Sequence, residues 1–203
     1  MRAPGQVDRA VSLGYSAGMA RSFVVLTALG HDRVGIVDDI SGPISSAGCN
    51  IEESKMAVLG GEFALMMLVS GPAASIDSVA GSLPGLGARL GLRVDCHPTH
   101  EPKAEEKGRP YLLKAVSLDT PGIVHAVTEV IRRHSINIED LETETAPAPW
   151  TGAPMFRLSA HLVLGPSVSL ASFKEELLQL QKEHDLDIDL KPVFAPGSET
   201  GSG

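Results

Sequence analysis

The sequence contains an internal duplication, and this repeat constrains the fold more than any other feature. Shifting the 203-residue chain against itself by 87 residues aligns residues 24–54 with residues 111–141 without a gap, and ten aligned positions are identical. The alignment resumes at a shift of 94, where Gly71-Pro72 meets Gly165-Pro166, so we expect seven extra residues in the second copy within 146–152. The identical pairs are Leu26/Leu113, Ala28/Ala115, Asp32/Asp119, Gly35/Gly122, Ile36/Ile123, Val37/Val124, Ile44/Ile131, Asn50/Asn137, Ile51/Ile138 and Glu52/Glu139. Self-similarity of this extent predicts two copies of one folded unit.

A charged segment separates the two copies. Six of the nine residues in 101–109 are charged and the others are Pro, Ala and Gly, which is typical of a solvated linker. This boundary predicts one unit over 20–100 and a second over 110–194. By their composition, residues 1–19 and 195–203 are expected to be disordered extensions.

Hydrophobic periodicity predicts the same order of elements in both copies: strand, helix, strand, strand, helix, strand. The predicted strands are 23–29, 50–59, 62–70 and 92–98 in the first copy, and 111–118, 137–145, 155–164 and 186–193 in the second. The predicted helices are 34–47, 75–90, 123–134 and 170–184. Pro84 and three glycines make us expect a short or broken helix over 75–90.

Two strand-helix-strand units joined by a hairpin give a four-stranded antiparallel sheet with both helices on one face. The predicted fold class is therefore α+β, with two ferredoxin-like units in tandem. In the helix over 170–184, we expect Phe173, Leu177, Leu178 and Leu180 to face inward.

The two copies differ on the face of the sheet that the helices leave open. In the second copy, the strand over 155–164 alternates between polar and apolar side chains. In the first copy, residues 23–26 and 63–69 are apolar on both faces, so we expect another unit to cover the helix-free face.

Charge and composition exclude several classes of function. Lys and Arg number 17 against 25 for Asp and Glu, giving a net charge of −8, which argues against direct nucleic-acid binding. Neither a membrane-spanning run nor a secretory signal is present, so the expected location is the cytoplasm. The two cysteines and seven histidines form no metal-binding motif, and no catalytic or phosphate-binding motif is found. We expect no enzyme activity, no metal and no cofactor.

The segment before the first helix of each copy is the leading candidate for a binding site. It reads His31-Asp-Arg-Val-Gly35 in the first copy and Leu118-Asp-Thr-Pro-Gly122 in the second. The free N–H groups and the dipole at a helix start can hold a carboxylate. The alternative is that Asp32 and Asp119 only cap their own helices.

Asn50 and Asn137 are the second candidate feature, since each lies 15 residues after its glycine and opens a strand. An Asn amide can bind both the amino and the carboxylate group of an amino acid, although Asn can also simply turn the chain. We expect each Asn at the same end of its sheet as the turn before the first helix.

Several segments resemble a known family. Residues 26–37 (LTALGHDRVGIV), 48–54 (GCNIEES) and 61–71 (GEFALMMLVSG) look like the first ACT domain of the glycine cleavage system transcriptional repressor family. Residues 119–124 (DTPGIV) and 136–139 (INIE) are similar to the general ACT pattern. The resemblance covers about 22–194 and implies tandem ACT domains, a ferredoxin-like fold, and amino acids bound between paired units.

The resemblance also implies which residues meet the ligand. They are His31, Asp32, Arg33, Val34, Gly35, Asn50, Asp119, Thr120, Pro121, Gly122 and Asn137. Val34 departs from the family pattern, in which Pro is usual, and this costs the first turn rigidity and leaves one extra N–H.

The resemblance further implies a protein that acts by binding a DNA-binding activator rather than DNA. The expected protein is thus an amino-acid-sensing regulator, with glycine or serine as first ligands, a transcription activator as protein partner, and a homodimer as assembly. Two alternatives remain open: a regulatory subunit of an amino-acid metabolic enzyme, and a ligand-independent assembly scaffold.

Overall fold

The computed structural model describes residues 21–101, 108–149 and 151–193. The chain divides into two compact units, with the boundary between residues 103 and 104. The two predicted extensions and the middle of the predicted linker lie outside the described residues. In the described part of the chain, no helix has the length and apolar character needed to cross a membrane.

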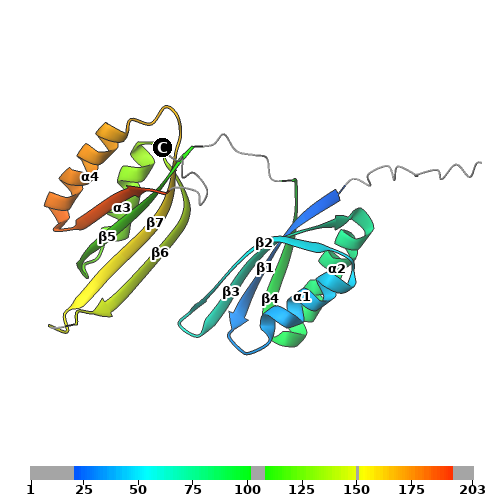
Figure 1. Cartoon of the computed structure of the whole chain (residues 1–203). Helices are drawn as coiled ribbons and strands as arrows, with labels where there is room; N and C mark the ends of the chain where they lie inside the picture. The colour runs from blue at the N-terminus through cyan, green and yellow to red at the C-terminus, as the bar shows by residue number, and fades with distance from the viewer. Residues whose placement is uncertain (1–20, 102–107, 150, 194–203) are drawn as a thin grey trace, which may run out of the picture. The chain divides into compact units, whose positions relative to one another are not determined.

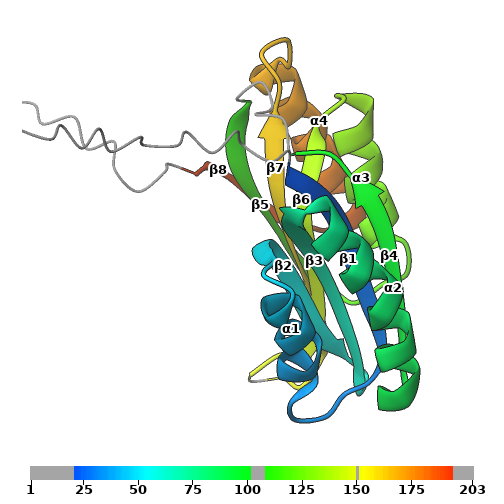
Figure 2. The ribbon, with the colours of Figure 1, turned by 90° about the vertical axis from the view of Figure 1, so that its right-hand side faces the viewer.

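The first unit is a four-stranded antiparallel sheet with two helices on one face (Figures 1 and 2). Its strand order is β2-β3-β1-β4. The elements are β1 (Arg21–His31), α1 (Ile36–Ser46), β2 (Asn50–Leu59), β3 (Glu62–Pro72), α2 (Ala73–Leu90) and β4 (Leu92–Thr99). The order and topology predicted from the sequence are confirmed.

The second unit repeats this arrangement with the strand order β6-β7-β5-β8 (Figure 1). Its elements are β5 (Arg109–Leu118), α3 (Ile123–Arg133), β6 (Asn137–Pro147), β7 (Pro154–Leu164), α4 (Leu170–His184) and β8 (Asp187–Pro192). The α+β class and the tandem ferredoxin-like units are therefore both confirmed.

Each unit has its own apolar core. In the first unit the core includes Leu26, Ile40, Phe63 and Leu83, all at most 1% exposed. In the second it includes Leu113, Val127, Leu162 and Phe173, again at most 1% exposed. Two separate cores are what a duplicated folding unit requires, because each copy must bury its own apolar surface.

Helix α2 is longer and more regular than predicted. It runs for 18 residues without a break, although Pro84 lies inside it. Ile76, Val79 and Leu83 are buried along one side, so tertiary packing outweighs the poor helix propensity. Gly87 has a packing role, since a Cβ there would lie 2.4 Å from Cγ2 of Val94 on β4. The expectation of a short or broken helix is therefore wrong. Gly87 lets α2 pack closely against the sheet, and this packing stabilises the whole helix.

Two smaller expectations also need correction. Leu178 is 56% exposed rather than inward-facing, and it lies beside Ile188 and Leu190 along an apolar groove between α4 and β8.

The second correction concerns the seven extra residues expected within 146–152. Leu65 pairs with Ala28, and Leu158 pairs with Ala115, so β7 is equivalent to β3 at an offset of 93. Six of the seven extra residues therefore lie in the β6–β7 hairpin and the seventh follows β7.

A β-bulge is repeated near the start of the second strand of each unit. The pairing of β2 with β3 shifts between Ile51 and Glu53, and that of β6 with β7 shifts between Ile138 and Asp140. The extra residue is Glu52 in one copy and Glu139 in the other. A bulge changes the direction of the side chain of its extra residue. The repeated Asn-Ile-Glu sequence therefore coincides with a β-bulge in both units.

Candidate functional site

Both predicted helix starts are built around a glycine in the left-handed region. Gly35 precedes α1 with φ 91°, and Gly122 precedes α3 with φ 99°. A Cβ at either position would meet no neighbour closer than 4.0 Å, so the backbone angle rather than crowding favours glycine. In both copies, glycine is therefore favoured at this position by the positive φ of the turn.

The alternative that the two aspartates cap their helices is wrong. Gly35 and Gly122 occupy the cap positions, and neither helix start has a side-chain cap hydrogen bond. The aspartates are instead held through their backbone: the N–H of Asp32 donates to the carbonyl oxygen of Gly61, and that of Asp119 to Pro154, both at 3.0 Å. The carboxylates are exposed.

The N–H groups at both helix starts precede the first helical hydrogen bond. That bond runs from Asp39 N to Gly35 O in α1 and from Ala126 N to Gly122 O in α3, at 2.9 Å in each case. The N–H groups of 36–38 and 123–125 therefore lack an i→i−4 acceptor and carry the positive end of the helix dipole. Such groups can bind a carboxylate.

The two helix starts differ in charge. The first turn of α1 contains Asp38 and Asp39, whereas that of α3 contains no acidic residue. Nη2 of Arg33 lies 2.7 Å from Oδ2 of Asp39, so the guanidinium is folded onto the helix. Asp38 and Asp39 make the start of α1 less favourable for an incoming anion than the start of α3, although the Arg33 guanidinium offsets part of the Asp39 charge.

The other predicted residues of the turns lie on open surface. The His31 side chain is 90% exposed, with Nδ1 3.2 Å from Oε1 of Glu62, and Val34 is 99% exposed. Thr120 and Pro121 are exposed as well. In each unit by itself, the described side chains of the turn thus lie open to solvent.

The structure does not bring Asn50 and Asn137 to the turns. Asn50 pairs with Ser70, which pairs with Phe23, while His31 pairs with Glu62. Phe23 and His31 are eight positions apart on β1, which is about 26 Å of extended strand. The expectation of a shared end is wrong because α1 carries the chain back to the end where β1 began, so β2 starts far from the turn.

Asn137 has the corresponding position in the second unit. It pairs with Val163, which pairs with Pro110 near the start of β5, whereas Leu118 at the far end of β5 precedes the turn. The turn and the Asn of one unit cannot contact the same small ligand. Within each unit the predicted binding residues therefore form two separate groups.

Asn50 belongs to a polar cluster that the sequence did not reveal. Ser70, which is fully buried, donates a hydrogen bond to Oε1 of the bulged Glu52. Nη2 of Arg21 donates to the same carboxylate at 2.8 Å and to Oγ of Ser70 at 2.5 Å. Hydrogen bonds from Ser70 and Asn50, together with the Arg21 charge, hold the pKa of Glu52 below its usual value.

This cluster is specific to the first unit. The position of Ser70 opposite Asn50 is taken in the second unit by Val163, opposite Asn137, and a shift of 87 puts Gly108 at the position of Arg21. The identity of Glu52 and Glu139 in the repeat was the available signal. Their partners could not be found because they come from strands distant in sequence.

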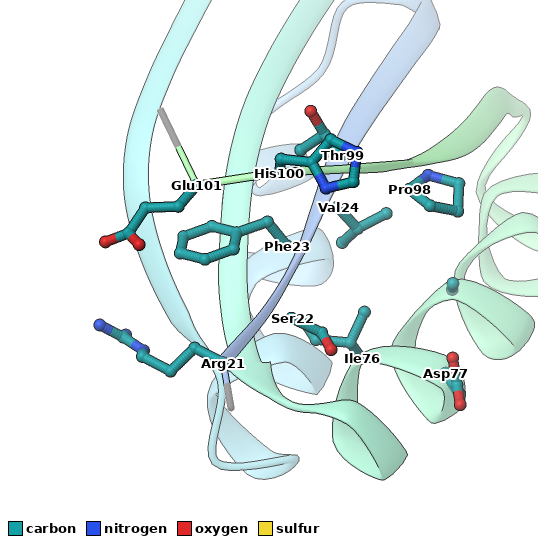
Figure 3. Close-up of a pocket in the computed structure, with 11 residues that line it drawn as sticks. Arg21, Ser22, Phe23, Val24, Ile76, Asp77, Pro98, Thr99, His100 and Glu101 are labelled. Carbon is teal, nitrogen blue, oxygen red and sulfur yellow. The ribbon is translucent and has the colours of Figure 1, made fainter. Parts of the chain in front are cut away.

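A cleft of about 490 Å³ lies beyond this cluster, between the start of β1, the end of β4 and α2. Figure 3 shows the Phe23 ring beside Glu101 and above Arg21, with Asp77 on the α2 side. The cleft has both cationic and anionic side chains. None of the predicted binding residues lines it.

Both cysteines and His134 take structural positions. Cys49 and Cys96 are free thiols packed against the first core, and burial raises the pKa of both. Among the residues that the structure describes, no three His, Cys, Asp or Glu side chains are grouped to hold a metal ion. His134 packs edge-on against Phe173, with ring centroids 5.3 Å apart.

Comparisons with known proteins agree with this architecture. The ACT domain family model matches residues 22–97. The glycine cleavage system transcriptional repressor of Escherichia coli is 37% identical over 130 residues, which is 64% of this chain and 68% of that protein. An unknown protein from Galdieria sulphuraria, solved by crystallography, is 32% identical with a TM-score of 0.76, covering 86% of this chain and 100% of the other.

A further crystal structure, assigned provisionally to a glycine cleavage system transcriptional repressor, is 26% identical with a TM-score of 0.67, covering 86% of this chain and 99% of the other. Two βαββαβ units with left-handed glycines at their first helix starts define a tandem ACT domain protein. Within that class, the chain belongs to the family of the glycine cleavage system transcriptional repressor.

Proposed function

We propose that this protein is a regulator that senses a free amino acid and acts through a protein partner, without catalysing a reaction. The observation that carries the proposal is the repeated left-handed glycine at the starts of α1 and α3, which presents helix N–H groups on open surface in both units. A glycine or serine ligand fits because its carboxylate can bind these groups and its small side chain requires no deep pocket.

The binding site for the ligand would be completed by a second ACT unit. Within one unit the turn and the Asn lie at opposite ends of the sheet, so a single amino acid can meet both only where two units pair in opposite directions. The surface on the turn side is suited to such pairing. Val37, Met56 and Val58 are each 40% to 54% exposed there, on α1 and the edge strand β2. Asn137 or Asn50 would then bind the ligand's amino group across the interface.

A protein partner would carry the signal. The similar protein of Escherichia coli is named a transcriptional repressor, which supports a regulatory role for this chain as well. With a net charge of −8, the chain is repelled by phosphate backbones, so a role in transcription requires a DNA-binding partner. The homodimer and the cytoplasmic location belong to this proposal.

Calorimetry and thermal unfolding with a panel of free amino acids test the sensing step. A ligand present at 100 times its dissociation constant stabilises the folded state by about 2.7 kcal/mol. Asn137→Ala and Gly122→Val should each weaken binding, while Glu175→Gln on the exposed side of α4 should not. If no amino acid gives heat or a shift, the sensing role is refuted and the scaffold alternative stands.

Affinity capture with the full chain tests the partner. Recovery of a DNA-binding protein whose yield changes with the bound amino acid supports the regulator. Recovery of a catalytic chain instead would favour the regulatory-subunit alternative. Capture that ignores every ligand would favour the scaffold.

A further inference from the structure

The sheet of the first unit exposes an apolar face on the side away from α1 and α2. Cross-strand pairing places Val25, Thr27 and Leu29 of β1 beside Leu68, Met66 and Ala64 of β3 on this face. Leu29 is 43% exposed and Met66 is 52% exposed. We call these six residues the apolar stripe. A contiguous apolar surface on two central strands is typical of an interaction site.

The corresponding face of the second unit is polar. The positions of Met66 and Thr27 are taken there by Ser159 of β7 and Lys114 of β5, which pair with each other. Arg157 and His161 are the next exposed side chains along β7. Since the two units share one fold, this difference lies in their surfaces alone.

The edge strands of the first unit carry opposite charges level with the stripe. Lys55 of β2 pairs with Met66, Met66 with Thr27, and Thr27 with Asp95 of β4, so these four residues form one row across the sheet. The neighbouring row runs from Glu53 through Leu68 and Val25 to His97. Each row thus has an acidic group at one edge and a basic or protonatable group at the other.

We propose that the apolar stripe docks face to face on the same stripe of a second copy of this chain. A two-fold axis parallel to the strands lays β2 of one copy over β4 of the other and keeps each row level. Lys55 of each copy then faces Asp95 of the other, and Glu53 faces His97. The match is reciprocal, as a two-fold interface requires.

The geometry of stacked sheets is compatible with these pairs. Sheets pack about 10 Å apart with their strands about 30° from parallel. The edge strands lie about 7 Å from the axis, so this angle displaces them by about 4 Å along the strand direction, which a lysine side chain can span. Charge pairs at the rim then fix the register of an apolar centre.

The second unit fits this arrangement poorly. Its row equivalent to Lys55–Asp95 runs from Glu142 through Ser159 and Lys114 to Asp189, so both edges are acidic and the centre contains a lysine. Stacking two such faces would oppose like charges and bury Lys114. The first unit alone has the composition for self-association, and this inference is independent of the proposed amino-acid ligand.

A charge exchange in the full-length chain tests the proposal by sedimentation equilibrium. Lys55→Glu and Asp95→Lys should each raise the dimer dissociation constant by more than about tenfold, because like charges then meet twice per dimer. The double variant Lys55→Glu/Asp95→Lys should restore the dimer. Within one chain the two positions are three strand spacings apart, about 14 Å, so rescue can only come from contacts between chains.

Glu142→Lys, at the position equivalent to Lys55 in the second unit, is the matched control and should leave self-association unchanged. Met66→Asp should abolish association through the apolar stripe in every background. Thermal unfolding confirms that each variant is folded, as expected for exposed positions. A monomeric parent chain, unaffected single variants, or a double variant that stays dissociated would each overturn the proposal.

Discussion

Ser70 donates a hydrogen bond to Glu52 from the fully buried end of β3 and thereby fixes the bulged residue of β2. Arg21 closes the cluster from β1. Glu139 occupies the same bulge in the second unit, where Val163 has replaced the serine. The first copy therefore contains a polar junction of three strands, buried only at Ser70, that its duplicate does not share.

Acidification should weaken the first unit through Glu52. The folded-state pKa of this carboxyl lies below its ordinary value of 4.5, chiefly because Ser70 donates to the ionised form. The resulting stabilisation is present above the unfolded pKa and is lost as pH falls through the folded pKa. Glu52→Gln should flatten this acid dependence in denaturant unfolding followed against pH, and Glu175→Gln should not. An unchanged slope in Glu52→Gln would rule out the cluster as its source.

Removing the aspartate of the first turn should barely affect stability. Because Gly35 is the cap of α1, Asp32→Ala is expected to change the free energy of unfolding by less than about 0.5 kcal/mol. Ser169 is a true side-chain cap of α4, accepting from Ser172 N at 3.3 Å, so Ser169→Ala should cost about 1 kcal/mol. Equal losses in urea titrations of both variants would show that Asp32 does cap its helix.

Alanine at either left-handed glycine should destabilise its unit. Gly35→Ala and Gly122→Ala force a Cβ into positive φ, at a cost of about 1–2 kcal/mol each. Asn tolerates this region better, so Gly35→Asn should lose less than Gly35→Ala. Chemical denaturation measures the difference. Alanine variants as stable as the parent would contradict the backbone geometry of both turns.

Two glycines of α2 should respond to alanine with opposite signs. A Cβ at Gly81 meets nothing within 4 Å, so Gly81→Ala should stabilise the first unit by about 0.5–1 kcal/mol. Gly87→Ala would press against Val94 and should cost about 1–3 kcal/mol. Thermal unfolding of the pair provides the check, and stabilisation by both would mean that α2 does not lie close to β4.

Much of the fold follows from local sequence signals. The alternation of polar and apolar residues, helical hydrophobic periodicity and glycine positions are each recognisable within a single element. The duplication provides a second, independent example of each element. This is why the order and type of all the described elements could be predicted, including the β2–β3 hairpin at Gly60-Gly61.

The candidate site was harder to predict because it depends on direction and on distant contacts. In a strand-helix-strand unit the two strands run the same way, so Asn50 starts where β1 started, far from Gly35. The sign of φ at Gly35 and Gly122 decides which residue caps the helix, and it is a property of the folded backbone. The contact of Ser70 with Glu52 spans 18 residues and depends on strand register.

The backbone hydrogen bonds at the two turns explain how the sequences of the two copies could diverge while both turns kept their conformation. Asp32 is tied to Gly61 and Asp119 to Pro154 only through main-chain atoms, one beside a tight hairpin and the other after a longer loop. The connecting loop can therefore accept new length or new side chains while the helix start keeps its shape. For protein engineering, the β6–β7 loop is therefore a position where a reporter group can be inserted without changing the conformation of the turn.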